Sequence, residues 1–315
     1  MKKMLNEEVI EGRLYQHSLV AKTVKDKESK NFGKPFISGN IEIAVDENGL
    51  NVIPVHFTYV TPQTAKGGKN LTYAFLEKII NENKTWIEVG KDEALKIKAT
   101  PAISLTEFYK EDGTLISVKT NEGGFLNNVN ELSPEKNRNT FKADMLITSI
   151  TEKEANPEKN IDAYVAVRGA IFDFRNRILP VEFKVCSEEG MNYFLSEITA
   201  SPKEPYFVCV WGRLNCLTES TEKTTESAFG EASVTFYENK RKDWIITGIS
   251  KAPYDFGDES ILTVEDVTKA MQDREIQLAE IKKRREEYNA KNSGNSNSAS
   301  ASAPAATVKN GDFQF

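Results

Sequence analysis

Lysines and an aromatic residue share a polar loop near the N-terminus of the chain. Residues 21–35 read AKTVKDKESKNFGKP, and their five lysines against two acids give the loop a charge of +3. The lysines are Lys22, Lys25, Lys27, Lys30 and Lys34. Lysines can neutralise phosphate groups and release counterions, and Phe32 can stack on a base. The alternative is a solvated surface loop, because runs of charge usually lie in water.

Cations and aromatic residues are also interleaved in the second half of the chain. Three arginines surround a predicted hairpin that carries Phe172 and Phe174, and Lys240-Arg241-Lys242 precedes Trp244. This arrangement is typical of surfaces that combine base stacking with phosphate contacts. The candidate contacts are Lys22, Lys25, Lys27, Lys30, Phe32, Lys34, Phe36, Phe57, Tyr59, Lys66, Lys69, Trp86, Arg168, Phe172, Phe174, Arg175, Arg177, Trp211, Arg213, Lys240, Arg241, Lys242 and Trp244.

Each of these aromatic residues has a competing interpretation as part of a core. Val55, Phe57 and Tyr59 alternate along one run with His56, Thr58 and Val60, and alternation alone does not say which set is buried. Gly67 and Gly68, between Lys66 and Lys69, either let the backbone approach a phosphate or simply make the loop flexible.

Catalytic patterns are nearly absent from the sequence. Lys110-Glu111-Asp112-Gly113 matches the K-x-D-G nucleophile motif of nucleotidyltransferases, but it lies between two strand-like runs and is most simply a hairpin turn. The motifs G-x-x-x-x-G-K-[ST], G-x-S-x-G and H-E-x-x-H do not occur, and the chain has only two histidines. Three cysteines without C-x-x-C spacing argue against a zinc site or a disulfide framework. We expect neither an enzyme nor a cofactor.

The elements that would hold these residues occur twice. Residues 39–60 and 169–186 both contain G-x-I, a turn, and an apolar-Pro-Val-x-Phe run. The matched pairs are Gly39 with Gly169, Ile41 with Ile171, Ile53 with Leu179, Pro54 with Pro180, Val55 with Val181, and Phe57 with Phe183. Because the order of the matches is kept, the two halves are predicted to be one repeated unit.

Each half follows the same order of elements. A first strand (12–20; 141–150) precedes a hairpin (36–60; 164–185), a short helix with apolar residues at helical spacing (71–79; 193–198), and two further strands. This order predicts an all-β protein with minor α content, built from two tandem OB-fold-like five-stranded Greek-key barrels. We expect a first domain over 1–120, a connector over 121–140 and a second domain over 141–258.

The C-terminal part has a different character. Residues 263–290 predict one helix with Thr263 as N-cap, within a C-terminal segment over 259–290. The helix either packs on the second barrel or associates with another copy as a coiled coil. A linker over 291–309, rich in small residues, should remain disordered, because it cannot bury enough surface to offset its ordering entropy. Two aromatic residues then reappear in a tip over 310–315.

Composition sets broad limits on the chain. It has 315 residues with 41 Lys plus Arg against 47 Asp plus Glu, so its net charge of −6 gives no global attraction for polyanions. Any such site must be local. No run of about 18 apolar residues occurs, and the N-terminus turns acidic before an apolar run develops. We therefore expect a cytoplasmic protein.

The predicted plan resembles the single-stranded DNA-binding proteins of bacterial and phage replication. In that family an OB-fold core wraps single-stranded DNA, and an acidic-aromatic tip docks replication and repair proteins. The residues that would match the tip are Asp312, Phe313 and Phe315. The bacterial tip has several acids and a Pro-Phe end, whereas this chain has one acid and Gln314-Phe315. Two tandem barrels are closer to a divergent phage-type version.

The resemblance implies sequence-independent binding and protection of single-stranded DNA during replication, recombination and repair, with partner proteins recruited by the tip. A different class of function stays open at this point. The barrels could form a scaffold or a virion-associated interaction protein without nucleic-acid affinity, assembled through the helix at 263–290. An RNA-binding OB protein is a nearer alternative, because stacking and phosphate contacts serve both polymers.

Overall fold

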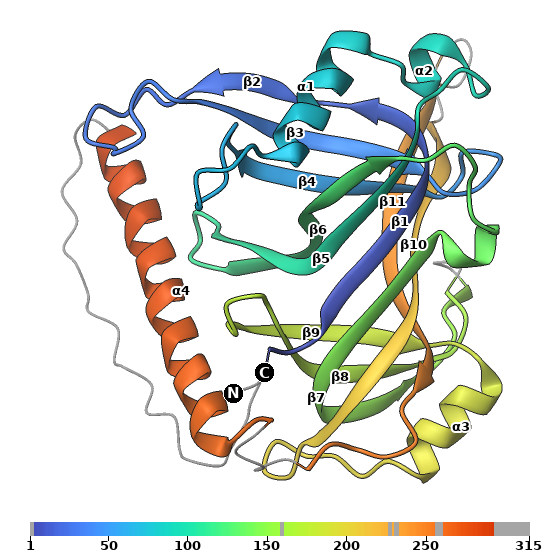
Figure 1. Ribbon diagram of the computed structural model, residues 1–315. Helices are drawn as coiled ribbons and strands as arrows, with labels where there is room; N and C mark the ends of the chain where they lie inside the picture. The colour runs from blue at the N-terminus through green and yellow to red at the C-terminus, as the bar shows by residue number, and fades with distance from the viewer. Residues whose placement is uncertain (1–2, 158–160, 226–228, 230–232, 256–260, 293–315) are drawn as a thin grey trace.

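The computed structural model describes residues 3–157, 161–225, 229, 233–255 and 261–292. Its strands form one eleven-stranded sheet that closes into two barrels (Figure 1). The strands of the first barrel are β1 (Asn6–His17), β3 (Pro35–Ala44), β4 (Val52–Val60), β5 (Lys96–Tyr109) and β6 (Leu115–Asn128). Those of the second are β7 (Asn139–Lys153), β8 (Tyr164–Phe172), β9 (Ile178–Val185), β10 (Tyr206–Thr225) and β11 (Ser233–Ile249).

Both barrels have the same strand order. The first closes as β1-β3-β4-β6-β5-β1 and the second as β7-β8-β9-β11-β10-β7. In each barrel the third and fifth strands run parallel, at His56 beside Glu122 and at Lys184 beside Ile245. The helices α1 (Leu71–Glu82) and α2 (Trp86–Val89), or α3 (Glu188–Ser196), connect the third strand to the fourth. The prediction of two tandem OB-type barrels is confirmed.

The residues of the repeat occupy equivalent places in the two barrels. Gly39 and Gly169 lie on the second strand, against the backbone of the first. A Cβ atom at Gly39 would come within 2.3 Å of the Ser18 carbonyl oxygen, and one at Gly169 within 1.8 Å of the Leu146 carbonyl oxygen. On the third strand, Phe57 and Phe183 are both buried in the core. Close strand packing and core filling therefore explain why these residue types recur.

The short helix of the first barrel begins where a side chain can cap it. The Asn70 side chain accepts hydrogen bonds from the backbone N–H groups of Thr72 and Tyr73, and Ile79 is buried. Leu71, which the helical spacing placed on the buried face, is instead 72% exposed in the first turn.

Two segment boundaries differ from the sequence prediction. The expected connector over 121–140 overlaps β6, which continues to Asn128 because its residues pair with β5 as far as Ile97. The chain passes from the first barrel to the second through the stretch between Asn128 and β7, which contains a 3-10 turn at Glu135–Asn137. The start of the polar loop at 21–35 belongs to a short strand, β2 (Val20–Thr23), which pairs with β3. The predicted hairpin turn at Lys110 to Gly113 is confirmed, with Lys110 N–H bonded to the Thr114 carbonyl.

The barrels are joined directly. Strands β1 and β7 pair antiparallel from Asn6 beside Ala143 to Ile10 beside Asn139. The ladder of one barrel therefore continues into the other, and side chains of both belong to one buried cluster. In Figure 1 β1 runs from the lower barrel into the upper one.

The C-terminal helix α4 (Val264–Asn292) spans both barrels (Figure 1). Thr263 caps it, since its hydroxyl accepts from the Asp266 N–H at 3.1 Å. Val267 and Ala270 pack on the second barrel, as predicted, and Arg274 then reaches Glu107 on β5 of the first barrel at 2.9 Å. No helix within the described ranges is long and apolar enough to cross a membrane. The predicted linker after residue 292 and the tip residues Asp312, Phe313 and Phe315 lie outside the described residues.

Candidate nucleic-acid interface

Burial removes three aromatic residues from the candidate set. Phe57 is 1% exposed, Phe172 is fully buried and Trp244 is 1% exposed. The rings of Phe57 and Trp244 lie in the barrel core, whereas the Phe172 ring lies in a second buried cluster, between the second barrel and the start of α4. The Trp244 indole N–H donates to the Glu8 carboxylate at 2.9 Å. Their assignment as base-stacking residues was therefore wrong, because a ring in a core has no free face.

Ion pairs engage several of the predicted cationic contacts in the second barrel. Four predicted contacts are held by acids: Arg168 by Glu182 at 2.6 Å, Arg177 by Asp173 at 2.6 Å, Lys240 by Glu42 at 3.1 Å, and Arg241 by Asp243 at 3.0 Å. A phosphate would have to compete with these carboxylates. Lys242 is half-buried on β11, and the Arg175 guanidinium lies 5.0 Å from the ring centre of Phe174 at an exposed hairpin tip.

The first barrel presents two aromatic rings together at one end of its β3–β4 hairpin. The ring centres of Phe36 and Tyr59 are 4.7 Å apart, and Tyr59 is 43% exposed. Phe36 lies opposite Lys22 across the β2–β3 pair. Gly39 on β3 pairs with Phe57 on β4, and Ile37 pairs with Val60. The two pairs are two residues apart on β3 but three residues apart on β4, so β4 has a bulge there. This bulge places Tyr59 outward, although Phe57 two residues earlier is buried.

The polar loop lies beside this ring pair. Phe32 is 54% exposed, Lys34 donates to the Asn31 side-chain oxygen at 3.1 Å, and all five lysines of the loop are exposed. A pocket of about 670 Å³ is lined by Lys34, Tyr59 and the neighbouring loop at 61–65. That loop continues to Lys66 and Lys69, which are exposed.

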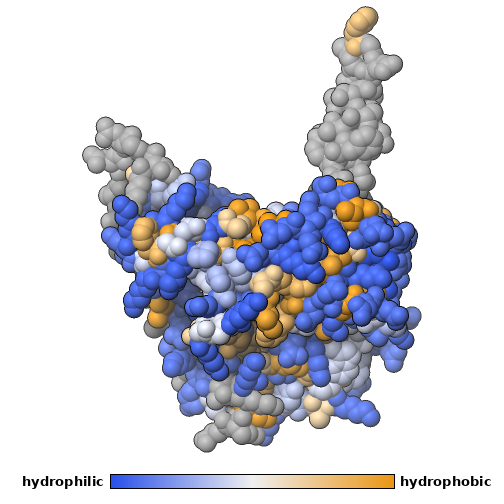
Figure 2. All heavy atoms as spheres, turned by 45° about the horizontal axis from the view of Figure 1, so that its top comes forward, coloured by the Kyte–Doolittle hydropathy of each residue, from blue (hydrophilic) through white to orange (hydrophobic). Residues whose placement is uncertain are grey.

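We call Lys22, Lys34, Phe36 and Tyr59 the first-barrel patch. Within the ranges that the structure describes, neither of its lysines forms an ion pair, and the same is true of Lys25, Lys27, Lys30, Lys66 and Lys69. Figure 2, turned towards the β2 side, shows mostly hydrophilic residues with smaller apolar groups between them. Free cations beside exposed rings can hold a flexible polyanion and stack its bases.

Two other tryptophans lie outside the first-barrel patch. Trp86 is half-buried with its ring centre 5.9 Å from that of Tyr15, and Lys91 lies over it. Trp211, 39% exposed, lies on β10 near Arg213 and opposite Lys142 of β7. Sequence reasoning missed Lys142, although its place between the buried residues Phe141 and Ala143 signals an outward side chain.

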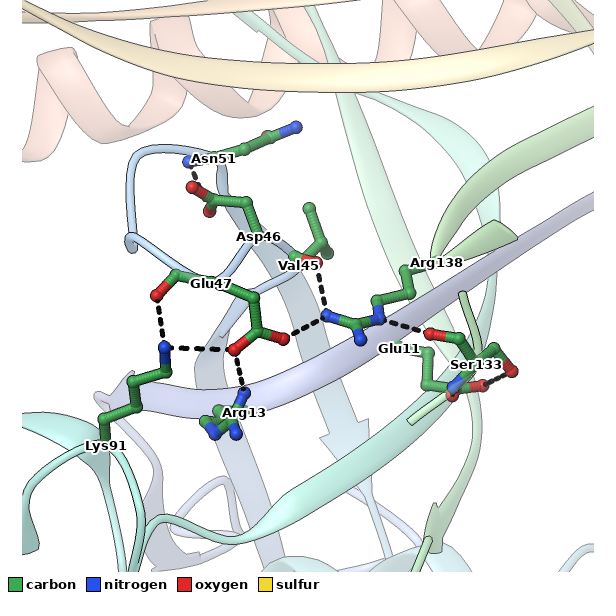
Figure 3. A network of polar contacts seen from close by, with 9 residues as sticks. All are labelled: Glu11, Arg13, Val45, Asp46, Glu47, Asn51, Lys91, Ser133 and Arg138. Carbon is green, nitrogen blue, oxygen red and sulfur yellow. Dashed lines mark hydrogen bonds and ion pairs between the residues drawn. The ribbon is translucent and has the colours of Figure 1, made fainter. Parts of the chain in front are cut away.

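A polar network fixes the opposite end of the β3–β4 hairpin (Figure 3). The Glu47 carboxylate pairs with Arg13 at 3.0 Å, Lys91 at 3.0 Å and Arg138 at 2.9 Å. Arg138 also donates to the Val45 and Ser133 carbonyls, so it ties the hairpin loop to the inter-barrel connection. Hydrogen bonds from Arg138 and Lys91 lower the pKa of Glu47 to about 2. All three cations hold the same carboxylate, so the network ties the hairpin loop to β1, to the segment after α2 and to the inter-barrel connection.

The described residues contain no group of three or more His, Cys, Asp or Glu side chains placed to hold a metal ion. Burial raises the pKa of the Cys209 and Cys216 thiols, which therefore stay protonated.

The fold and the surface together define a tandem OB-type protein with exposed cationic and aromatic patches. The chain belongs to the YorF family, whose model matches residues 10–284. A comparison with curated proteins finds no match. A search of solved structures finds a crystal structure of a deletion mutant of the single-stranded DNA binding protein from Thermus aquaticus, with a TM-score of 0.45 and 12% identity, covering 82% of this chain and 100% of that chain.

Proposed function

We propose that this protein binds single-stranded DNA without sequence preference through the first-barrel patch. The observation that carries the proposal is the pair formed by the half-buried Phe36 and the exposed Tyr59, with ring centres 4.7 Å apart. The pair lies beside lysines that form no ion pair among the residues that the structure describes. OB-folds bind oligonucleotides on the face of their second and third strands and through the loop after the first strand. In the first barrel these are β3, β4 and the lysine loop.

The physical basis is stacking combined with phosphate neutralisation. Every base has a π-face, so aromatic stacking is tolerant of sequence. The lysines act locally despite the net charge of −6, because acids more than about 8 Å away are largely screened at physiological salt. Exposed contacts of the second barrel, such as Phe174 and Arg175, would extend the same surface.

The proposal extends to a cellular role. Binding would protect single-stranded intermediates during replication, recombination and repair, in the host cytoplasm if the protein is phage-encoded. Asp312, Phe313 and Phe315 would recruit partner proteins. The helix α4 would be available for self-association only along the side that does not contact the barrels.

The first experiment measures anisotropy of a fluorescein-labelled oligo-dT at two salt concentrations, with the matching duplex as competitor. We expect salt-dependent binding that the duplex does not displace. The double variant Phe36→Ala/Tyr59→Ala should weaken binding by about 1–3 kcal/mol per stacked base. Phe108→Ala, which removes another exposed ring on β5, is the matched control and should bind normally.

Two results would contradict the proposal. Absence of binding at micromolar protein would favour the scaffold alternative. Wild-type affinity in the double variant would remove the first-barrel patch from the interface. An oligo-U arm decides between DNA and RNA, because tighter binding of oligo-U would reassign the protein to RNA.

A further inference from the structure

A second aromatic and cationic surface lies where the two barrels join. Along β10 the residues alternate, with Val210, Gly212 and Leu214 buried and Trp211 and Arg213 exposed. Register places Trp211 opposite Lys142 on β7, and Lys142 is opposite Glu7 on β1. One row of outward side chains therefore crosses from the first barrel to the second.

The Trp211 ring packs against the backbone at a glycine. A Cβ atom added at Gly248 on β11 would lie 2.3 Å from the indole Nε1 and 2.5 Å from Cε2. The ring thus rests directly on the β11 backbone at a position that any other residue would obstruct. Because Trp211 is still 39% exposed, part of this restrained ring remains open to a ligand.

The charges around this ring are available. Lys136, Lys142 and Arg213 are exposed, and none of them forms an ion pair among the residues that the structure describes. All three line one pocket of about 590 Å³ with Trp211. Among the described residues that line the pocket, Glu7 is the one acid, so cations predominate there.

This surface continues towards the first barrel. Lys136 and Arg213 also line an adjoining pocket that includes Asp46 and Asn51 at the far end of the β3–β4 hairpin. Tyr59 of the first-barrel patch lies at the other end of the same strand. Asn51, just before β4, and Tyr59 are eight positions apart, which corresponds to about 26 Å in an extended strand.

We propose that Trp211, Lys142, Arg213 and Lys136, here named the junction patch, form a second contact site for the same single-stranded DNA. A base stacks on the Trp211 ring, and the cations hold the flanking phosphates. This inference rests on the proposed function. It adds that a strand long enough to leave the first-barrel patch is bound a second time at the barrel junction.

Oligonucleotide length and intrinsic fluorescence test the junction patch together. A Trp86→Phe variant leaves Trp211 as the exposed tryptophan, because Trp244 is buried. Oligo-dT of about 6 and about 30 nucleotides should occupy one patch and both patches, respectively, since one OB-fold covers about 4–16 nucleotides. We expect the long oligonucleotide to quench Trp211 fluorescence and to bind more tightly than the short one.

Substitutions then separate the two patches. Trp211→Ala should weaken binding of the long oligonucleotide about 5- to 150-fold and leave binding of the short one unchanged, and Trp211→Phe should recover part of the loss. Lys142→Gln/Arg213→Gln should reduce the salt slope for the long oligonucleotide by about 1.4. Thermal unfolding followed by circular dichroism controls for folding.

The outcomes distinguish this inference from the proposed function. If Trp211→Ala binds the long oligonucleotide as tightly as the wild type, and no quenching occurs, the junction patch is wrong while binding at the first barrel stands. If the wild type binds neither oligonucleotide, both proposals are wrong.

Discussion

Single residues of this protein owe their roles to neighbours that are distant in sequence. Tyr59 follows the buried Phe57 by two residues, which in a regular strand would place both rings on one side. The bulge opposite Gly39 and Ile37 reverses that expectation and exposes the phenol beside Phe36. Strand alternation therefore showed neither which set of side chains is buried nor where the alternation breaks.

Glu8 is a second residue whose chemistry depends on its surroundings. It lies on β1 and is 1% exposed; Oε1 accepts from Trp244, whereas Oε2 has no partner among the described residues. Burial raises the pKa of Glu8 to about 8, against the smaller opposing effects of the Trp244 bond and the Lys242 charge. The folded state therefore retains a proton that the unfolded chain loses near pH 4.5.

This difference predicts a pH-dependent stability. Between about pH 4.5 and 8 the folded state binds more protons than the unfolded state, so the free energy of unfolding falls as the pH rises and levels off above 8. Glu8→Gln keeps an acceptor for Trp244 and should remove this decline, which stabilises the protein at pH 8 by on the order of a few kcal/mol. Urea unfolding at pH 5 and pH 8 measures it. Glu7→Gln, on the exposed side of the same strand, is the control, and equal pH profiles for both variants would contradict the assignment.

At the scale of elements, α4 contacts both barrels, and its own sequence did not show that it would reach the first one. Its first turns pack on the second barrel, and Arg274 then forms two bonds with the Glu107 carboxylate, at 2.9 and 2.5 Å. The side chains are 17% and 10% exposed, so this pair is largely withdrawn from water. Arg274 is therefore a contact by which the helix reaches the first barrel.

Removal of that arginine should loosen the helix. Arg274→Ala leaves Glu107 without its partner and should lower the free energy of unfolding by about 1–3 kcal/mol. Arg284→Ala breaks an exposed pair with Glu280 at 3.6 Å and should change it by less than about 1 kcal/mol. Urea unfolding compares the two, and hydrogen exchange reports whether α4 opens first. Equal effects of the two substitutions would show that the Arg274 pair does not anchor the helix.

At the scale of the whole molecule, a chain with a charge of −6 has to bind a polyanion through local surfaces. The salt dependence of binding counts the phosphates that these surfaces neutralise. Lys22→Gln/Lys34→Gln should lower the slope of log affinity against log salt by about 1.4, because each contact to a single strand contributes about 0.7. Lys283→Gln on α4 is the control. Lys283 is already paired with Glu287, so its substitution should leave the slope unchanged. An unchanged slope in the double variant would place the phosphates elsewhere.

Much of the architecture follows from the sequence alone. Two OB-type barrels followed by a helix were predictable from three features. These are the repeated G-x-I and Pro-Val-x-Phe runs, the turns between alternating segments, and the N-cap of the helix near the C-terminus. These are local features, since strand alternation, turn residues and caps act over a few positions. The lysines of the polar loop were likewise recognisable, because a charged loop needs no distant partner to stay in water.

The tertiary structure alone decided which candidates are available to a ligand. Lys240 is neutralised by Glu42, which lies 198 residues away in sequence, and Trp244 is buried against Glu8, 236 residues away. Lys142 and Trp211 become neighbours only when β7 pairs with β10. Such contacts arise from barrel closure and from the β1–β7 pairing, and no pattern confined to one segment encodes them. Residue types and spacing therefore determined the barrels, whereas long-range strand pairing determined which rings and charges remain free.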